Sequence, residues 1–312
     1  MPITPRHLAI ERVRSILGRQ YRRYRIRRLL PTPVLHMLRG VKSELSGPAS
    51  THQPTRGEEQ FTVNSSIVVP LPQFEGEFEL PSGNALTHHL LDGRFEKHIT
   101  ELLRAAVSDG DHFVDVGANL GVYTVLAGKL VGRRGRVLAV EPTPSMIQLL
   151  KCNIERNSLV NVTVFPGVVS DRQGNCTLEF VAGGEQYSAI DAIAHPDVPS
   201  GQRQKIAVAS ETLDTLLSRF DLCPSAIKVD TEGAEALVFS QASATLEHHR
   251  PAIFSELDQR LLAAHGGSAR AVADGWFACG YEVFNAATGE SYTPDNFPDG
   301  FIGDVVALPC LR

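Results

Sequence analysis

Short apolar runs alternate with longer segments of helical periodicity over the last two thirds of the chain. The β-rich runs are 113–116, 136–140, 162–165, 226–229 and 252–255. Crossover helices fit the intervening segments 123–131, 144–157 and 237–249. Near-continuous apolar strands that alternate with helices are typical of a parallel sheet covered on both faces. The pattern therefore predicts a doubly wound, mostly parallel α/β domain over residues 111–312.

The two ends of this pattern differ from its middle. The last two apolar runs, 281–284 and 302–308, have no helical segment between them, so they predict an antiparallel hairpin at the C-terminal edge of the sheet. Two strand-like stretches and one helix-like stretch precede the α/β domain, at 66–69, 77–80 and 95–107. They predict an N-terminal extension of strands and helix over residues 61–110.

Apolar residues also recur at helical spacing near the start of the chain. They alternate with arginines over residues 7–30, until Pro31 and Pro33 end the pattern. Residues 1–42 are therefore predicted to form a basic amphipathic helical segment, followed by a Ser-, Pro-, Gly- and Thr-rich linker at 43–60. The basic face has two interpretations: an ordinary solvated surface, or peripheral docking of residues 6–39 to an anionic membrane or an acidic partner.

Charge is divided unevenly between this segment and the rest. The first 42 residues hold eleven basic side chains and one acidic one, and the other 270 hold 19 basic and 34 acidic ones. The formal charges are therefore +10 and −15, which leave a net charge of −5 for the 312 residues. Because so acidic a body would repel a phosphate backbone, nucleic acid is not an expected partner.

Cysteines and targeting signals bear on the cellular compartment. There are five cysteines and no Cys-x-x-Cys spacing, which favours reduced thiols over a disulfide framework or a zinc site. No apolar run approaches the roughly 18–20 residues that cross a bilayer, and a secretory apolar core is absent. We expect a cytoplasmic protein, with peripheral membrane contact as the alternative raised by the basic segment.

The most informative motif is FVDVGANLGVYT at residues 113–124. A buried strand ends before Gly117 and a helix begins near Gly121, and glycine allows both a sharp turn and the close approach of a ligand. Glu141 follows Gly121 by 20 residues, at the end of the next strand, where an acid accepts hydrogen bonds from ribose hydroxyls. Together these features indicate an adenosine-containing ligand.

The carboxylate of Asp115 indicates which adenosine-containing ligand the turn binds. The motif lacks the pattern G-x-G-x-x-G, and a carboxylate in the turn would repel the pyrophosphate of a dinucleotide. The carboxylate suits a ligand with an ammonium group and no phosphate, such as S-adenosylmethionine. An NAD-linked oxidoreductase and a purely structural turn are the alternatives.

With these residues the chain resembles the FkbM-type S-adenosylmethionine-dependent methyltransferases over about residues 91–257. The matching segments are GRFE at 93–96, the motif at 113–124, Glu141-Pro142 with Asn153 and Asn157, NVTVFPGVVSD at 161–171, IKVDTEGAE at 227–235 and RPAIFSE at 250–256. Val168 departs from the smaller residue usual in the family. The resemblance implies a class I, Rossmann-like fold and methyl transfer to a hydroxyl of a sugar, glycolipid or polyketide-type natural product.

The resemblance also implies a set of cofactor-binding residues. These are Asp115, Gly117, Ala118, Asn119, Gly121, Glu141, Pro142, Val168 and Val169. Tyr123, Thr124 and Glu96 would lie at the methionine end of the cofactor. Residues 61–100 and 183–204 are expected to cover the site and to shape the acceptor pocket, with His88, His89 and Glu256 as substrate-binding residues.

Asp230 and Glu232 are the predicted catalytic residues, because ligands lie outside the carboxyl ends of parallel strands. Either carboxylate could bind the acceptor hydroxyl and remove its proton. Glu232 could instead stabilise a helix N-terminus, and Asp230 with Glu256 could hold a divalent cation. The metal-free reaction is preferred because only two ligands are visible. A non-catalytic cofactor-binding scaffold, docked through the basic segment, is the alternative function.

Overall fold

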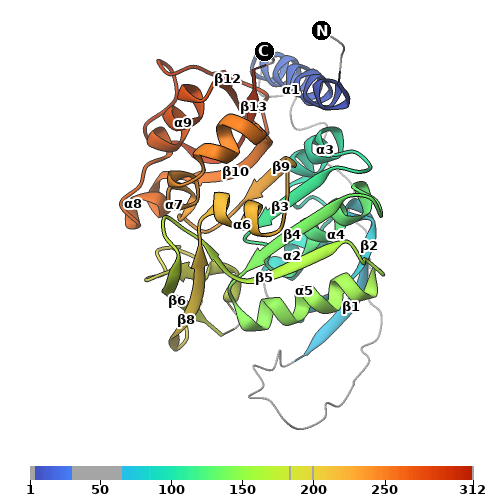
Figure 1. Cartoon of the computed structure of the whole chain (residues 1–312), viewed down its shortest axis with the longest axis vertical. Coiled ribbons are helices and arrows are strands. Elements are labelled where there is room, and N and C mark those ends of the chain that lie inside the picture. Colours follow the sequence, from blue (N-terminus) through green and yellow to red (C-terminus); the bar gives the residue numbers. More distant parts are fainter. Residues whose placement is uncertain (1–3, 30–64, 84, 183, 199, 311–312) are drawn as a thin grey trace.

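The structure is a computed structural model that describes residues 4–29, 65–83, 85–182, 184–198 and 200–310 (Figure 1). The predicted linker at 43–60 lies outside these residues. So do residues 30–42, the end of the predicted basic segment.

Five parallel strands form the centre of an eleven-stranded sheet within the described residues. They are β3 (His112–Val116), β4 (Arg136–Glu141), β5 (Val162–Val169), β9 (Pro224–Val229) and β10 (Ala252–Asp258). Their order is β10-β9-β3-β4-β5, with every neighbouring pair parallel. The chain order reverses between β3 and β9, where doubly wound sheets bind ligands. The predicted class I, Rossmann-like α/β fold is confirmed.

Helices cover both faces of this sheet. One face carries α3 (Lys97–Ala106), α4 (Val122–Leu130) and α5 (Pro144–Arg156), and the other carries α6 (Leu213–Arg219), α7 (Glu235–Ser240), α8 (Gln259–Ala264) and α9 (Ala269–Ala278). Side chains of β3 alternate between the two cores, so Phe113 packs with the first group of helices and Val114 with the second.

The prediction of one helix over 237–249 is wrong. Helix α7 ends at Ser240, and a separate π-helical turn, η5, spans Thr245–His249. The carboxylate of Asp214 accepts hydrogen bonds from the backbone N–H groups of Ala244 and Thr245, each at 2.9 Å. These bonds satisfy the donors that begin the second turn, so the chain starts a new helical element there.

Antiparallel strands lie at both edges of the sheet. At one edge β13 (Ile302–Pro309) lies between β10 and β11 (Tyr281–Asn285), beyond which is β12 (Ser291–Tyr292), so the predicted hairpin is confirmed. The other edge was not predicted. There β8 (Arg203–Glu211) pairs with β5 as a further parallel strand, and β6 (Gly174–Val181) and β7 (Ala189–Ile190) follow it as antiparallel strands. Polar residues interrupt these strands, which lowers their apolar signal.

Helix α1 (Pro5–Leu29) confirms the predicted N-terminal helix, but some of its apolar residues pack against the rest of the protein. Ile10, Val13 and Leu17 are buried in the same core as α3, and Arg14 pairs with Glu282 of β11 at 2.6 Å. This part of the apolar face therefore contacts protein, so it is not free to enter a membrane. Docking through residues 6–39 stays a prediction that depends on charge alone.

No helix in the described part of the chain is long and apolar enough to cross a membrane.

The N-terminal extension packs beside the α/β domain. It comprises β1 (Ser66–Leu71), the 3-10 turn η3 (Pro72–Phe74), β2 (Gly76–Pro81), α2 (Ala85–Leu91) and α3. Asn153 of α5 accepts a hydrogen bond from Glu79 N at 2.7 Å and donates one to Glu79 O at 3.2 Å, and Asn157 bonds Glu77 in the same way. These amides anchor the β1–β2 hairpin, so α2 and the start of α3 reach the carboxyl edge of the sheet (Figure 1).

Candidate active site

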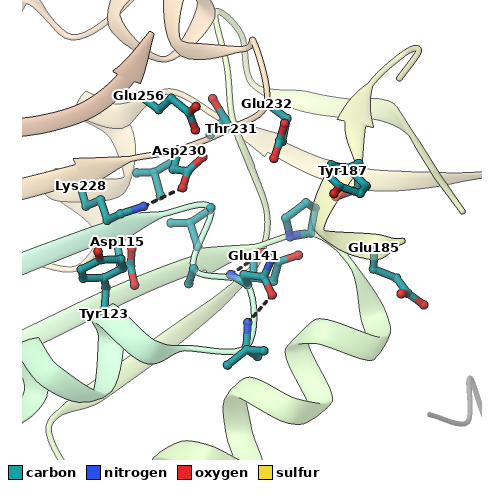
Figure 2. Close-up of a pocket in the computed structure, with 18 of the residues that line it drawn as sticks. Asp115, Tyr123, Glu141, Glu185, Tyr187, Lys228, Asp230, Thr231, Glu232 and Glu256 are labelled. Atoms are coloured by element: carbon teal, nitrogen blue, oxygen red, sulfur yellow. Dashed lines mark hydrogen bonds and ion pairs between the residues drawn. The ribbon is translucent and has the colours of Figure 1, made fainter. Parts of the chain in front are cut away.

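A cavity lies at the carboxyl ends of the central strands (Figure 2). Residues of α2 and of the segment just before α3 line part of it. Its lining includes most of the predicted cofactor residues: Glu96, Asp115, Gly117, Ala118, Asn119, Gly121, Tyr123, Glu141, Pro142, Val168 and Val169. Asp230, Glu232, Glu256 and His89 line the same cavity. The tertiary structure thus brings together residues from both halves of the α/β domain.

Two predicted site residues do not line the cavity. Thr124 is fully buried, and its hydroxyl donates a hydrogen bond to Asp115 Oδ2 at 2.6 Å. It therefore orients Asp115 without reaching the cavity itself. His88 is exposed on α2 and is not among the lining residues, because its neighbour His89 takes the helix position that faces the cavity. Both assignments are therefore corrected.

The turn after β3 needs glycine at position 117. Its φ is +82°, and a Cβ there would lie 1.8 Å from the backbone oxygen of Asp230. The turn also directs the Asn119 N–H to Glu141 Oε2 at 2.8 Å, while Thr143 N–H donates to Oε1 at 2.9 Å. Burial raises the pKa of Glu141 to about 7, although these two amides oppose the shift. The strand-end acid is thus held in one orientation at the cavity wall.

Asp115 is 1% exposed and lines the cavity beneath the turn. Its Oδ2 accepts the Thr124 hydrogen bond, but its Oδ1 is buried and has no hydrogen-bond partner among the described residues. Burial raises the pKa of this carboxyl group above its ordinary value. A buried acceptor without a partner is costly, so this oxygen marks a position where a donor from a ligand would be stabilised.

Lys228 was not predicted as a site residue. It is 6% exposed, lies opposite Asp115 in the register of β9 and β3, and donates to Asp230 Oδ2 at 2.8 Å. The available signal was a lysine between the apolar residues Ile227 and Val229, since strands that are buried on both faces rarely contain a charge. Burial alone would lower the pKa of Lys228, but Asp230, Glu96 and Asp115 together raise it above its usual value.

Glu96 reaches the cavity from the N-terminus of α3. Its Oε2 accepts a hydrogen bond from the hydroxyl of Tyr123 at 2.8 Å, which links the extension to α4. Burial raises the pKa of Glu96 to about 7 against the opposing charge of Lys228.

Glu232 and Glu256 face the cavity beside Asp230 (Figure 2). The charge of Asp230, followed by burial, raises the pKa of Glu256 to about 9. Burial, followed by the charges of Asp230 and Glu256, raises the pKa of Glu232 well above its usual value. The alternative role of Glu232 at a helix N-terminus is wrong, because α7 begins at Glu235, whose Oε1 accepts hydrogen bonds from Thr231 N and Oγ1, each at 2.8 Å.

The segment between β6 and β7 also supplies lining residues that were not predicted individually. Glu185 and Tyr187, from the 3-10 turn η4 (Glu185–Tyr187), lie at the Glu141 end of the cavity (Figure 2), and Ser188 also lines it. Ser188 Oγ is 3.0 Å from Thr143 Oγ1. Within the described residues, no group of three or more His, Cys, Asp or Glu side chains is arranged to hold a metal ion.

Comparison with known families agrees with this geometry. Residues 115–283, a little over half of the chain, match the model of the methyltransferase FkbM domain. The chain belongs to the FkbM methyltransferase family. It is therefore an S-adenosylmethionine-dependent methyltransferase, which favours this cofactor over the NAD alternative.

Similar proteins place this FkbM methyltransferase among enzymes with different acceptors. It is 31% identical over 128 residues to the probable cobalt-precorrin-6B C(15)-methyltransferase (decarboxylating) of Sulfurisphaera tokodaii, across 39% of this chain and 67% of that protein. It is 30% identical over 101 residues to the protein-L-isoaspartate O-methyltransferase of Methanococcoides burtonii, across 32% of this chain and 46% of that protein. The crystal structure of methyltransferase FkbM from Methylobacillus flagellatus aligns with a TM-score of 0.40 and 16% identity, across 64% of this chain and 44% of that one. The chain thus spans about two thirds or less of these relatives.

Proposed function

We propose that this methyltransferase transfers a methyl group to a hydroxyl oxygen of a sugar, glycolipid or polyketide-type product. The observation that carries the proposal is the carboxylate of Asp230, which faces the same cavity as the turn after β3 and is paired with Lys228 at 2.8 Å. An ionised carboxylate at this place can orient a hydroxyl group and take its proton.

The lining supports S-adenosylmethionine as the bound cofactor, which supplies an electrophilic methyl group on a sulfonium centre. Asp115 Oδ1, buried and without a partner among the described residues, would accept a hydrogen bond from an ammonium group. Glu141 would accept hydrogen bonds from the ribose hydroxyls, and Val168 and Val169 would contact the adenine. Gly117 leaves room at the turn, since its missing Cβ would meet the Asp230 backbone.

The proposed proton transfer uses Asp230. Bound S-adenosylmethionine would supply the methyl group to the acceptor oxygen, and the Asp230 carboxylate would take the proton that the hydroxyl group gives up. Glu232 and Glu256, whose pKa values are raised, would donate or accept hydrogen bonds at the acceptor rather than compete as bases.

The acceptor would lie between the extension and the ends of β9 and β10. Leu86, Leu90 and Phe95 form an apolar wall, and His89 and Glu256 add polar groups at its rim. An apolar wall with few polar groups suits the face of a sugar ring or a polyketide-type scaffold. A screen of glycan and macrolide-like hydroxyl compounds with labelled S-adenosylmethionine tests this proposal. Cofactor binding without methyl transfer to any of them would favour the scaffold alternative.

The pH dependence of cofactor binding tests the role of Glu141. Ribose hydroxyls donate to the ionised carboxylate, so protons compete with the cofactor. Affinity for S-adenosylhomocysteine is therefore expected to fall as the pH drops below about 7 and to level off above it. Glu141→Gln should weaken binding by about 10- to 100-fold, the range for a charge-assisted hydrogen bond, and remove this dependence. Titration calorimetry between pH 5.5 and 8.5 measures both effects.

Glu96 needs its own control because its pKa is also raised to about 7. Glu96→Gln should preserve the pH dependence of binding. If that variant removes the dependence while Glu141→Gln keeps it, the ribose assignment to Glu141 is wrong.

Excess chelator is expected to leave turnover unchanged. The ammonium group of Lys228 lies 2.8 Å from Asp230 Oδ2, so it would repel a divalent cation shared by Asp230 and Glu256. The assay compares initial rates of the purified enzyme before and after treatment with a chelator. A rate that is lost on chelation and restored by added Mg²⁺ would establish the metal alternative.

A further inference from the structure

Lys228 is a charge inside an apolar strand. Its neighbours Ile227 and Val229 are fully buried in the core on the opposite face of the sheet. Its own side chain points to the cavity, where the ammonium group lies 2.8 Å from Asp230 Oδ2 and 4.7 Å from the centre of the Tyr123 ring (Figure 2). Burial of a lysine charge costs free energy unless the charge is paired, which suggests that the charge has a function in the site.

Carboxylates surround this single cation. The titratable groups that face it or its pair are Asp115 on β3, Tyr123 on α4, Glu96 before α3, Asp230 and Glu232 after β9, Glu256 on β10 and Asp304 on β13. Asp304 is itself paired with His98 Nε2 at 2.7 Å. Lys228 is the one lysine or arginine among the described residues that line the cavity. The carboxyl groups therefore compete for one positive charge.

Of these carboxylates, Asp230 is the one placed to pair directly with Lys228 among the described residues. Among the described residues, Asp230 makes a direct ion pair with Lys228, whereas Glu96 is bonded to Tyr123 and Asp115 to Thr124. The pKa of Glu256 is raised, chiefly by the charge of Asp230 and then by burial. The pKa of Lys228 is raised as well, so the lysine keeps its proton.

We propose that Lys228 is a positioning residue for methyl transfer: its ammonium group, which is paired with Asp230 Oδ2 at 2.8 Å, fixes the Asp230 carboxylate toward the acceptor. This inference rests on the proposed role of Asp230 as the proton acceptor. Lys228 itself transfers no proton.

Calorimetry with S-adenosylhomocysteine first shows whether Lys228→Met and a second variant, Lys228→Gln, fold and bind the cofactor. Both variants keep Asp115 and Glu141, which are proposed to hold it, so a folded variant should still bind.

Turnover then tests the proposal, with an acceptor found in the screen. Lys228→Met or Lys228→Gln should lose about tenfold or more of the turnover rate while still binding S-adenosylhomocysteine, because nothing then fixes the Asp230 carboxylate in place. Lys228→Arg keeps a cationic donor beside Asp230 and should retain most of the wild-type rate. Lys151→Met, at an exposed position on α5, is the matched control and should be unchanged.

The two proposals fail in different ways. If Asp230→Asn retains turnover, the assignment of the proton acceptor is wrong. If Asp230→Asn loses turnover while Lys228→Met or Lys228→Gln keeps the wild-type rate, only the role of Lys228 is wrong.

Discussion

Asp230→Asn is expected to reduce the turnover rate by about 10²- to 10⁴-fold, the usual contribution of a positioned acid or base. The substitution preserves the shape of the side chain and its place beside Lys228, but it removes the group that accepts the hydroxyl proton. Affinity for S-adenosylhomocysteine should remain close to that of the wild type, because Asp115 and Glu141 are proposed to hold the cofactor. Initial rates with labelled S-adenosylmethionine and calorimetry separate the two quantities.

Glu232→Gln provides the informative comparison. The pKa of Glu232 is raised well above its usual value, so glutamine resembles its neutral form and should cost much less turnover. Asp221→Asn, at a side chain that is 96% exposed, is the surface control. A fully active Asp230→Asn together with an inactive Glu232→Gln would transfer the role of proton acceptor to Glu232.

Gly117→Ala is expected to have the largest effect on stability. A Cβ at this position would lie 1.8 Å from the Asp230 backbone oxygen, and the φ of +82° is unfavourable for alanine. The backbone conformation costs about 1–2 kcal/mol and the forced repacking about 1–3 kcal/mol, so the free energy of unfolding should fall by about 2–5 kcal/mol. Cofactor binding should be lost as well, because the clash displaces the turn from the end of β9.

Gly110→Ala is the matched control for this effect. Gly110 has a similar φ of +89°, but a Cβ there would have no heavy atom within 4 Å. The free energy of unfolding of Gly110→Ala should therefore fall only by the conformational cost of about 1–2 kcal/mol, and the cofactor affinity should be unchanged. Denaturant unfolding of both variants measures the difference. Equal destabilisation would show that the close approach of the turn to Asp230 contributes little.

Local patterns were sufficient to predict the centre of the fold. The parallel strands, and a turn with glycines at 117 and 121, follow from features within a few residues of one another. The edge strands β6, β7 and β8 were missed because polar residues interrupt them. Pairing of β8 with β5, of β6 with β8 and of β7 with β6, rather than local hydrophobicity, makes them strands. The apolar residues of α1 predicted a helix but not that α3 covers them.

In the site, too, some residues could be predicted from local sequence, whereas the roles of others depend on the tertiary structure. Asp115, Glu141 and Asp230 were predicted, because each ends a recognisable strand near the carboxyl edge of the sheet. Lys228 carried a local signal, but its meaning depends on Asp115 from β3 and Glu96 from the extension, which are more than 100 residues away in the chain. Thr124 and His88 were misplaced because spacing indicates the face of a helix only approximately.

The sequence by itself determined the α/β architecture, the glycine turn and the acids at the strand ends, since these depend on periodicity and on residues that adjoin along the chain. Only the tertiary structure decided how those acids differ from one another. Their surroundings depend on burial and on charges a few ångströms away in space. Only folding gathers Asp115, Glu96 and Glu256 around the Lys228–Asp230 pair.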